Sequence, residues 1–504
     1  MKSRRFLSAF LCAVLALTLL TPAALANSWG LKSGMILNAV SKTHDYDEYT
    51  ALAQLKLPDG EVAVMASRYH AVLLYAYQFK GELRLEASHT AVKQPDEKDY
   101  KKVKLQAESP GFVLKYSDME LHFFPWVGYN RRTYTLQSGK IGKLTLQPGG
   151  VNSESTGWLT CSDGENTVDW FVADEGVLTL TQLNLRLFPR TMEELGAIME
   201  LKSIVAPQCE IFGLGDGEEV PGDAGASTVP VYSAPSESSV RFAKGKASVN
   251  LRAPVKFYGL SRDESWMLVE YEVSDRTSRF GYVKRSELPR SMAQTQTMIF
   301  SSIDMPVTIT KDTYLTDDPN VSQYHQMTLK AGDGVRLLGL QGAFYAYIET
   351  TLGGKTVRGF VPAACVRYPL PTEEAPEIAA RLVGDWESAG GGEVLGIYTA
   401  FLTDGRMLTD WLPQAKKETL STQERSLYGV PSWRTYQVYK STERERAGFR
   451  GEYAYILVLR SLAGYITNFY ALDFDTDEAG RESFALYFGD GGGNYARYEG
   501  GASQ

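Results

Sequence analysis

The sequence predicts an all-β fold divided among several domains, and three observations lead to this prediction. Short β-prone runs separated by turn residues recur along the 504-residue chain, which is typical of antiparallel sandwiches and barrels. The clearest helical spacing of apolar side chains is confined to a short segment, residues 192–202. A chain of this length also exceeds what one hydrophobic core supports, so about three or four domains are expected.

The first 26 residues have the order of a secretory signal peptide. Lys2, Arg4 and Arg5 precede an apolar run over residues 6–20, and small residues lead to a predicted cleavage site after Ala26. No later stretch has about 18 consecutive apolar residues, so no stable membrane insertion is expected. The sequence therefore predicts a secreted protein that is released or associated with the cell wall.

Composition excludes some classes of partner. Without the predicted signal peptide, 49 basic residues face 60 acidic ones, a net charge of −11. An acidic chain gains no counterion-release advantage on nucleic acid, so no nucleic-acid partner is expected. Three cysteines remain, Cys161, Cys209 and Cys365, and an odd number does not form a complete disulfide framework. Whether Cys161 pairs with Cys209 stays open.

Residues 27–206 are predicted to form a β-rich N-terminal domain. A sandwich, a barrel and a few propeller-like blades all fit its strand count, and the helix at 192–202 is interpreted as closing this domain. An aromatic and basic cluster at residues 121–134 could stack on sugars. Such clusters more often form core with a solvated rim, and this second interpretation is preferred.

Two segments have the composition of linkers. Residues 207–228 are rich in glycine and acidic groups and contain few large apolar side chains. Residues 369–377 are shorter and proline-rich, and are expected to act as a stiff spacer.

Between the two predicted linkers the chain repeats itself. Three pairs of segments align: residues 255–260 with 335–340, 266–270 with 345–349, and 281–283 with 359–361. Self-similarity at an offset of about 80 residues indicates two copies of one module, because the period of a solenoid is shorter.

These residues resemble the bacterial SH3-like domains of secreted and wall-associated proteins. The shared pattern is an early turn with proline, a strand ending near glycine, a late Gly-aromatic-Val triplet, and a closing apolar residue, here Leu288 and Val366. The resemblance implies two small barrels, at residues 229–290 and 300–368, each offering a groove to a short peptide or glycan chain.

The resemblance also implies a set of ligand-binding residues: Tyr232, Trp266, Tyr282, Tyr345 and Phe360. The second copy has Tyr345 where the first has Trp266, which weakens the transfer of a binding surface to it. Large aromatic side chains also dominate small cores, so Trp266 and Tyr282 are preferably interpreted as core residues.

Residues 378–500 are predicted to form a C-terminal antiparallel β-barrel. Gly384 and Trp386 near its start and Arg497 near its end resemble lipocalin-like (calycin) barrels, in which the arginine packs over the tryptophan. A barrel filled by its own side chains is preferred over one that holds a ligand. The acidic segment 473–478 is interpreted as a hairpin turn, because Glu478 stands where a calcium loop requires glycine.

No catalytic constellation is found in the sequence. Its five histidines match no metal-binding motif: His44, His70, His89, His122 and His325. Cys161 is the only candidate nucleophile of the N-terminal domain, and it lacks an activating cation or helix N-terminus nearby.

The sequence therefore predicts a non-catalytic binding protein of the bacterial cell envelope, without cofactor or metal, that recognises peptidoglycan or a peptide through the two SH3-like modules. One alternative is a carrier or sensor of a small ligand in the C-terminal barrel. Another is a cell-wall hydrolase that uses Cys161 or paired carboxylates. The oligomeric state stays open.

Overall fold

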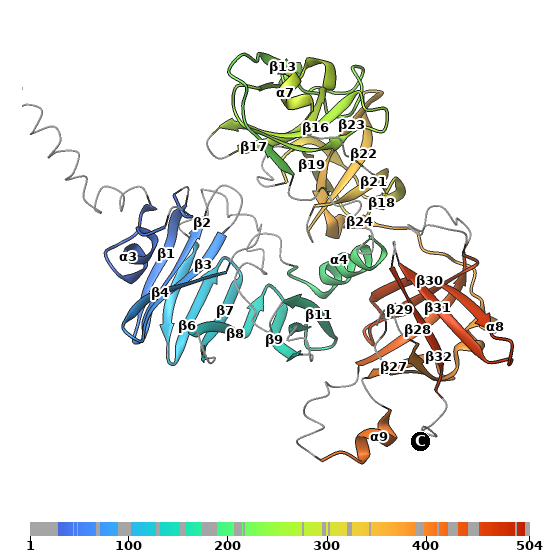
Figure 1. Ribbon diagram of the computed structural model, residues 1–504. Coiled ribbons are helices and arrows are strands. Elements are labelled where there is room, and N and C mark those ends of the chain that lie inside the picture. The colour runs from blue at the N-terminus through green and yellow to red at the C-terminus, as the bar shows by residue number, and fades with distance from the viewer. Residues whose placement is uncertain are drawn as a thin grey trace, which may run out of the picture. The chain divides into compact units, whose positions relative to one another are not determined.

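A computed structural model gives the architecture of the chain. It describes residues 29–43, 45–47, 49–66, 71–88, 102–127, 132–151, 157–173, 189–205, 214, 217–274, 277–294, 299–300, 303–319, 325–341, 344–389, 395, 398–410, 413–421, 432–441, 453–488 and 491–498. The all-β, multi-domain prediction is confirmed (Figure 1). The predicted signal peptide, 1–26, lies outside the described residues. Within them, no helix has both the length and the apolar character needed to cross a membrane.

The chain divides into two compact units, with the boundary near Pro189. The first unit contains two antiparallel meanders, with strand orders β1-β2-β3-β4 and β5 through β11, although residues 150–154 and 162–168 group with the second unit (Figure 1). Its elements are α3 (Met35–Val40), β1 (Thr50–Leu57), β2 (Gly60–Ala66), β3 (Ala71–Phe79), β4 (Glu82–Ser88), β5 (Lys104–Glu108), β6 (Gly111–Tyr116), β7 (Met119–Val127), β8 (Arg132–Ile141), β9 (Leu144–Val151), β10 (Gly157–Ser162) and β11 (Thr167–Ala173).

The core of the first unit explains its aromatic cluster. Leu121 and Phe123 on β7 are fully buried, and Phe123 stacks on Phe112 of β6 with ring centroids 5.1 Å apart. Tyr134 on β8 is also buried and meets Phe112 edge-on. These side chains alternate toward one face of the sheet, as the period of two along a strand requires. For these residues the interpretation as core is confirmed.

The second unit begins with a helix, α4 (Met192–Val205), which is longer than the predicted segment. Thr191 caps its start, because its hydroxyl accepts the backbone N–H of Glu194 at 3.1 Å. The prediction that this helix closes the N-terminal domain is wrong. Its buried Leu201 joins the core of the second unit, and Glu194 pairs with Lys311 at 3.0 Å.

Two modules follow α4 and have the same strand plan. Module 1 comprises β12 (Glu218–Val220), β13 (Thr228–Pro230), β14 (Ser248–Asn250), β15 (Val255–Leu260), β16 (Trp266–Ser274) and β17 (Thr277–Lys284), with the short helices α6 (Phe242–Gly245), η4 (Arg285–Glu287) and α7 (Arg290–Ala293). Module 2 comprises β18 (Met305–Ile309), β19 (Thr313–Thr316), β20 (His325–Leu329), β21 (Gly334–Gln341), β22 (Tyr345–Leu352), β23 (Lys355–Pro362), η5 (Ala363–Cys365) and β24 (Val366–Arg367). The order β12-β15-β16-β17 corresponds to β18-β21-β22-β23.

Irregularities at matching positions show that the modules are two copies of one fold. The pairing of β15 with β16 shifts register next to Gly259, and the pairing of β21 with β22 shifts next to Gly339. A side chain on Gly281 would approach the carbonyl oxygen of Tyr232 to 2.8 Å, and one on Gly359 would approach that of Thr316 to 2.7 Å. Each glycine therefore lets an earlier strand cross closely.

Part of the predicted Gly-rich linker, residues 207–228, belongs to module 1. Strand β12 pairs with β15, and Val220 is buried in the core. A side chain on Gly222 would lie 2.0 Å from the carbonyl oxygen of Arg252. Here glycine permits close packing of two backbones, so the prediction of a linker is wrong for residues 217–228. Residues 207–213 and 215–216 lie outside the described residues.

The proline-rich segment, 369–377, is not a free spacer. The backbone N–H of Lys440 donates to the carbonyl of Glu373, and that of Ala375 donates to Val438, so the segment extends along β28 (Ser432–Lys440). Lys440 also pairs with the carboxylate of Glu373 at 2.6 Å. Backbone pairing and this ion pair hold the segment against the barrel.

Residues from Gly384 form a closed antiparallel barrel of eight strands in sequence order (Figure 1). Its elements are α8 (Pro376–Leu382), β25 (Gly384–Ser388), β26 (Tyr398–Phe401), β27 (Arg406–Asp410), α9 (Gln414–Glu418), β28, β29 (Tyr455–Arg460), β30 (Ile466–Thr476), β31 (Glu482–Phe488) and β32 (Gly491–Arg497). Bulky buried side chains, among them Phe401, Tyr470 and Phe484, occupy its interior. The acidic segment 473–478 ends strand β30 and enters the turn to β31, where Asp477 accepts two backbone N–H groups.

Candidate ligand-binding cleft of the two modules

Most of the predicted ligand-binding side chains are buried within the modules. Trp266 is 7% exposed, Tyr345 is 2% exposed, and Tyr282 and Phe360 are fully buried. Tyr232 is partly exposed and meets Trp266 edge-on, with ring centroids 5.2 Å apart. The burial of Trp266 and Tyr282 supports their interpretation as core residues.

The two modules pack against each other through β17 of module 1. The backbone N–H of Phe280 donates to the carbonyl of Asp317 at 2.8 Å, and the rings of Phe280 and Phe360 meet edge-on at 5.0 Å. Arg279 of the same strand lies 3.4 Å from the carboxylate of Asp317, which is 1% exposed. Burial raises the pKa of Asp317 to about 6, although Arg279 and Gln326 oppose the shift.

An open hollow of about 430 Å³ lies at this junction, and we call it the inter-module cleft. It takes residues from both modules and from the segment between them. Its lining consists of Pro235, Ser261, Arg262, Asp263, Tyr282, Ile299, Phe300 and Arg358. Tyr282 is thus the one predicted site residue found in this lining.

Arg358 and Tyr282 join the two modules at the cleft. A guanidinium nitrogen of Arg358 donates to the Tyr282 hydroxyl at 2.8 Å, and another donates to the Glu349 carboxylate at 2.7 Å. Burial acts to lower the pKa of Arg358, but Tyr282, Tyr347 and Glu349 outweigh it and hold that pKa above its usual value. The guanidinium is therefore a fixed positive charge in a partly desolvated position.

The segment that carries Ile299 and Phe300 is fixed on module 1. Leu260 of β15 forms an isolated parallel bridge with Ile299, and its carbonyl accepts the backbone N–H of Phe300 at 2.7 Å. The Ile299 side chain nevertheless remains 47% exposed. An apolar side chain held open beside charged groups is suited to contact with a ligand.

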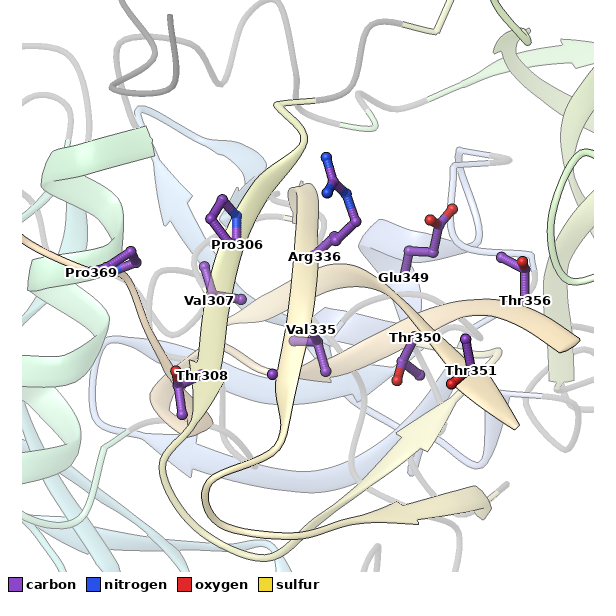
Figure 2. A pocket seen from close by; sticks show the side chains of 11 residues that line it. Pro306, Val307, Thr308, Val335, Arg336, Glu349, Thr350, Thr351, Thr356 and Pro369 are labelled. Carbon is purple, nitrogen blue, oxygen red and sulfur yellow. The ribbon is translucent and has the colours of Figure 1, made fainter. Parts of the chain in front are cut away.

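A second hollow, of about 550 Å³, lies on the sheet of module 2, and we call it the sheet groove (Figure 2). Its lining consists of Pro306, Val307, Thr308, Gly334, Val335, Arg336, Glu349, Thr350, Thr351, Thr356 and Pro369. Figure 2 shows Arg336 and Glu349 side by side on neighbouring strands. Asp304 holds Arg336 through a 2.5 Å ion pair. Glu349 lines this groove and Arg358 lines the cleft, so their ion pair lies between the two hollows.

Sequence reasoning did not identify Arg262, Ile299, Phe300 or Arg358 as site residues. The internal alignment contained one usable signal. When Gly281 is aligned with Gly359, Arg358 of module 2 takes the position of Phe280 in module 1. A charged residue at a position where the other copy has an aromatic side chain indicates that the two positions have different functions. Nothing comparable marks Arg262 or the segment at 299–300.

The alternative sites have features that do not favour catalysis. Cys161 is fully buried, whereas a reactive thiol is normally accessible. His122 Nδ1 lies 2.6 Å from a carboxylate oxygen of Glu108. The other candidates lie outside the described residues: Cys209, His44, His70, His89 and the side chain of His325. Over the described part of the chain, no group of three or more His, Cys, Asp or Glu residues could hold a metal ion.

The predicted contact in the C-terminal barrel is confirmed. The Arg497 guanidinium lies 3.9 Å from the centre of the Trp386 ring and donates to the carbonyl oxygens of Arg381 and Val383. Gly384 has a φ of +123°, which favours glycine, and a side chain there would also lie 2.5 Å from this guanidinium. Trp386 is fully buried in the core of the barrel.

Comparisons with known proteins add little to this description. No protein-family model matches the sequence, and no curated protein matches it. Among solved structures, the chain is similar to the structure of NlpC2 from Trichomonas vaginalis, with 10% identity over 50% of this chain and 97% of the other, and a TM-score of 0.15.

Proposed function

We propose that this chain is an exported, non-catalytic binding protein of the bacterial cell envelope, which holds a peptide or the peptide part of peptidoglycan in the inter-module cleft. The signal-peptide pattern and the resemblance of the modules to bacterial SH3-like domains support the location and the class. The observation that carries the proposal is the cleft itself, because aromatic, apolar and guanidinium groups from both modules converge on one open hollow.

The ionisable groups of the cleft favour recognition over chemistry. Asp263 accepts the Ser261 hydroxyl at 2.5 Å and also that of Ser265, and these hydrogen bonds lower the pKa of its carboxyl group. A carboxylate held in its ionised form makes a poor general acid. Arg358 is similarly committed to Glu349 and Tyr282, so it can position a ligand but cannot exchange a proton.

Sedimentation with purified peptidoglycan tests this proposal on the mature chain. We expect Ile299→Asp to weaken binding at least five-fold, because the variant places a charge in the apolar part of the cleft. Leu462→Asp is the matched control, since Leu462 is 64% exposed on the barrel and lies outside the cleft.

Thermal unfolding of both variants verifies that each is folded. Unchanged sedimentation of Ile299→Asp would refute the assignment of the cleft. An equal loss of binding in the two variants would show that any added surface charge weakens binding, and would also refute it.

A further inference from the structure

Arg262 differs from the other charged residues around the inter-module cleft. It is exposed, it lines the hollow, and among the described residues it has no hydrogen-bond or ion-pair partner. Arg358, in contrast, is committed to Glu349 and Tyr282. An arginine side chain presents five donors in a planar arrangement that matches a carboxylate. Arg262 therefore offers an unused donor set at the mouth of the cleft.

The turn that carries Arg262 is held in place by its neighbours. Ser261 and Ser265 donate their hydroxyls to the Asp263 carboxylate, and the Ser261 hydroxyl accepts the backbone N–H of Trp266 at 3.0 Å. These contacts anchor the turn to the buried start of β16. They also occupy both oxygens of the Asp263 carboxylate, and among the described residues no ion pair joins this carboxylate to Arg262. A ligand does not have to order this loop.

The electrostatic field in this region is set by more than one guanidinium. Arg336, through its ion pair, and then Arg358 and Arg262 all lower the pKa of Asp304. Three positive groups thus act on one small volume of the surface. Asp304 is already engaged by Arg336 at 2.5 Å, and Glu349 is engaged by Arg358. Of the two guanidinium groups that line the cleft, Arg358 is thus paired with a carboxylate and, within the described part of the chain, Arg262 is not.

Apolar groups lie in the same lining as these charges. Ile299 is 47% exposed, and Phe300 and Pro235 contribute further apolar surface. A ligand that fits this arrangement combines a small apolar side chain with an adjacent carboxylate. The carboxyl-terminal residue of a peptide has this combination. An internal peptide residue offers the side chain without the carboxylate.

We propose that the inter-module cleft recognises the carboxyl-terminal end of a peptide, with the terminal carboxylate on Arg262 and the last side chain against Ile299 and Phe300. This inference rests on the proposed function and specifies its ligand. A peptide-bearing wall polymer would then be bound at free stem-peptide ends.

Two peptides that differ in one group test the inference. Acetyl-Lys-D-Ala-D-Ala with a free carboxylate and the same peptide with a terminal amide are titrated into the mature chain by calorimetry. A hydrogen-bonded ion pair contributes enough that the free acid is expected to bind about ten-fold more tightly than the amide. Arg262→Gln is expected to bind the two peptides equally, while Arg290→Gln, an exposed arginine of module 1 outside the cleft lining, keeps the preference.

The outcomes separate this inference from the proposed function. Equal binding of acid and amide by the wild-type chain, or binding of neither, overturns carboxylate recognition. If Ile299→Asp still loses sedimentation with peptidoglycan in that case, the cleft remains the binding site for another part of the polymer. A preference for the acid that survives in Arg262→Gln also overturns the inference, because the carboxylate then lies elsewhere.

Discussion

Module 1 and module 2 carry the same glutamate at the same place in the same fold, and treat it differently. Glu270 lies opposite Phe280 in the pairing of β16 with β17, and Glu349 lies opposite Arg358 in the pairing of β22 with β23. In module 1, hydroxyl groups of Tyr258 and Ser278 donate to the carboxylate, at 2.7 and 2.6 Å. In module 2, the arginine donates to it.

This difference shows how one strand plan supports two roles. In module 1, neutral hydroxyl groups satisfy the hydrogen-bonding capacity of the Glu270 carboxylate. The residue paired with Glu270 on β17 therefore does not have to be a donor, and it is a core aromatic, Phe280. The arginine at that position in module 2 both satisfies Glu349 and reaches Tyr282 of module 1. The difference between phenylalanine in module 1 and arginine in module 2 at this position therefore adds a contact between the modules. The same arginine lines the inter-module cleft.

Removal of the arginine is expected to have the largest effect on stability. Arg358→Met breaks a partly buried ion pair and leaves Glu349 without its donor, which costs about 3 kcal/mol of unfolding free energy. Phe280→Met at the matching position of module 1 only trims an apolar contact and costs about 1 kcal/mol. Urea denaturation of both variants measures the difference. Equal losses would contradict the distinction between the modules.

The buried carboxylate between the modules predicts a dependence on pH. Because burial raises the pKa of Asp317 to about 6, against about 3.9 in an unfolded chain, the folded state binds more protons in the interval between these values. Stability contributed by the protonated form is therefore lost as the pH rises from about 4 to about 6, by at most about 3 kcal/mol. The Asp317→Asn variant has no ionisable group at this position and does not lose this stability. Its unfolding free energy, measured by urea denaturation, should therefore rise relative to that of the wild type between about pH 4 and about pH 6.

Asp312 provides a control of opposite sign in the same module. The amine of Lys330 and the backbone N–H of Ala331 donate to this exposed carboxylate and lower its pKa. Its contribution is present at neutral pH and is lost as the pH falls. Asp312→Asn should therefore lose stability relative to the wild type as the pH rises. If the two variants show the same trend, the assignment of Asp317 is wrong.

The two crossing glycines should respond alike, because the modules share this part of the fold. Gly281→Ala and Gly359→Ala each place a methyl group within 3 Å of a carbonyl oxygen of the crossing strand, at Tyr232 and Thr316. Overpacking against backbone costs about 2 kcal/mol in each module. Gly334→Ala, with open space around it, should change stability by less than about 0.5 kcal/mol. Different losses at the two crossings would contradict an equivalent strand plan.

Local patterns in the sequence were enough to predict the all-β class, the repeated modules and the C-terminal barrel, but not the sheets of the N-terminal unit. Three patterns were sufficient: the alternation of apolar residues, the two glycine triplets, and the pair Gly384 and Arg497 near the two ends of the barrel sequence. Each pattern follows from the geometry of strands or of their close crossings. Glycine outside turns was harder to interpret. Gly222 has the appearance of a linker residue, but it permits close approach to Arg252, and such an approach is visible only in three dimensions.

The candidate site could be predicted only in part. Tyr282 was selected for its aromatic ring, although what matters at the cleft is its hydroxyl, which accepts from Arg358. Arg262 and Ile299 lie in ordinary surface segments, and their role depends on how the second module packs on the first. The propensity and periodicity of residues predict individual strands. They do not predict how one module packs on the other.

The smallest effect is expected at the tips of the matching hairpins. Val273 is the last residue but one of β16 in module 1 and is 43% exposed, and Leu352 ends β22 of module 2 with 40% exposure. Val273→Ser and Leu352→Ser remove little buried surface, so each should change the unfolding free energy by less than about 0.5 kcal/mol. Peptidoglycan sedimentation should also stay unchanged, since neither residue lines the inter-module cleft. A loss of binding in Leu352→Ser alone would move the binding surface from the cleft toward the sheet groove, whose Thr351 and Thr356 flank this tip.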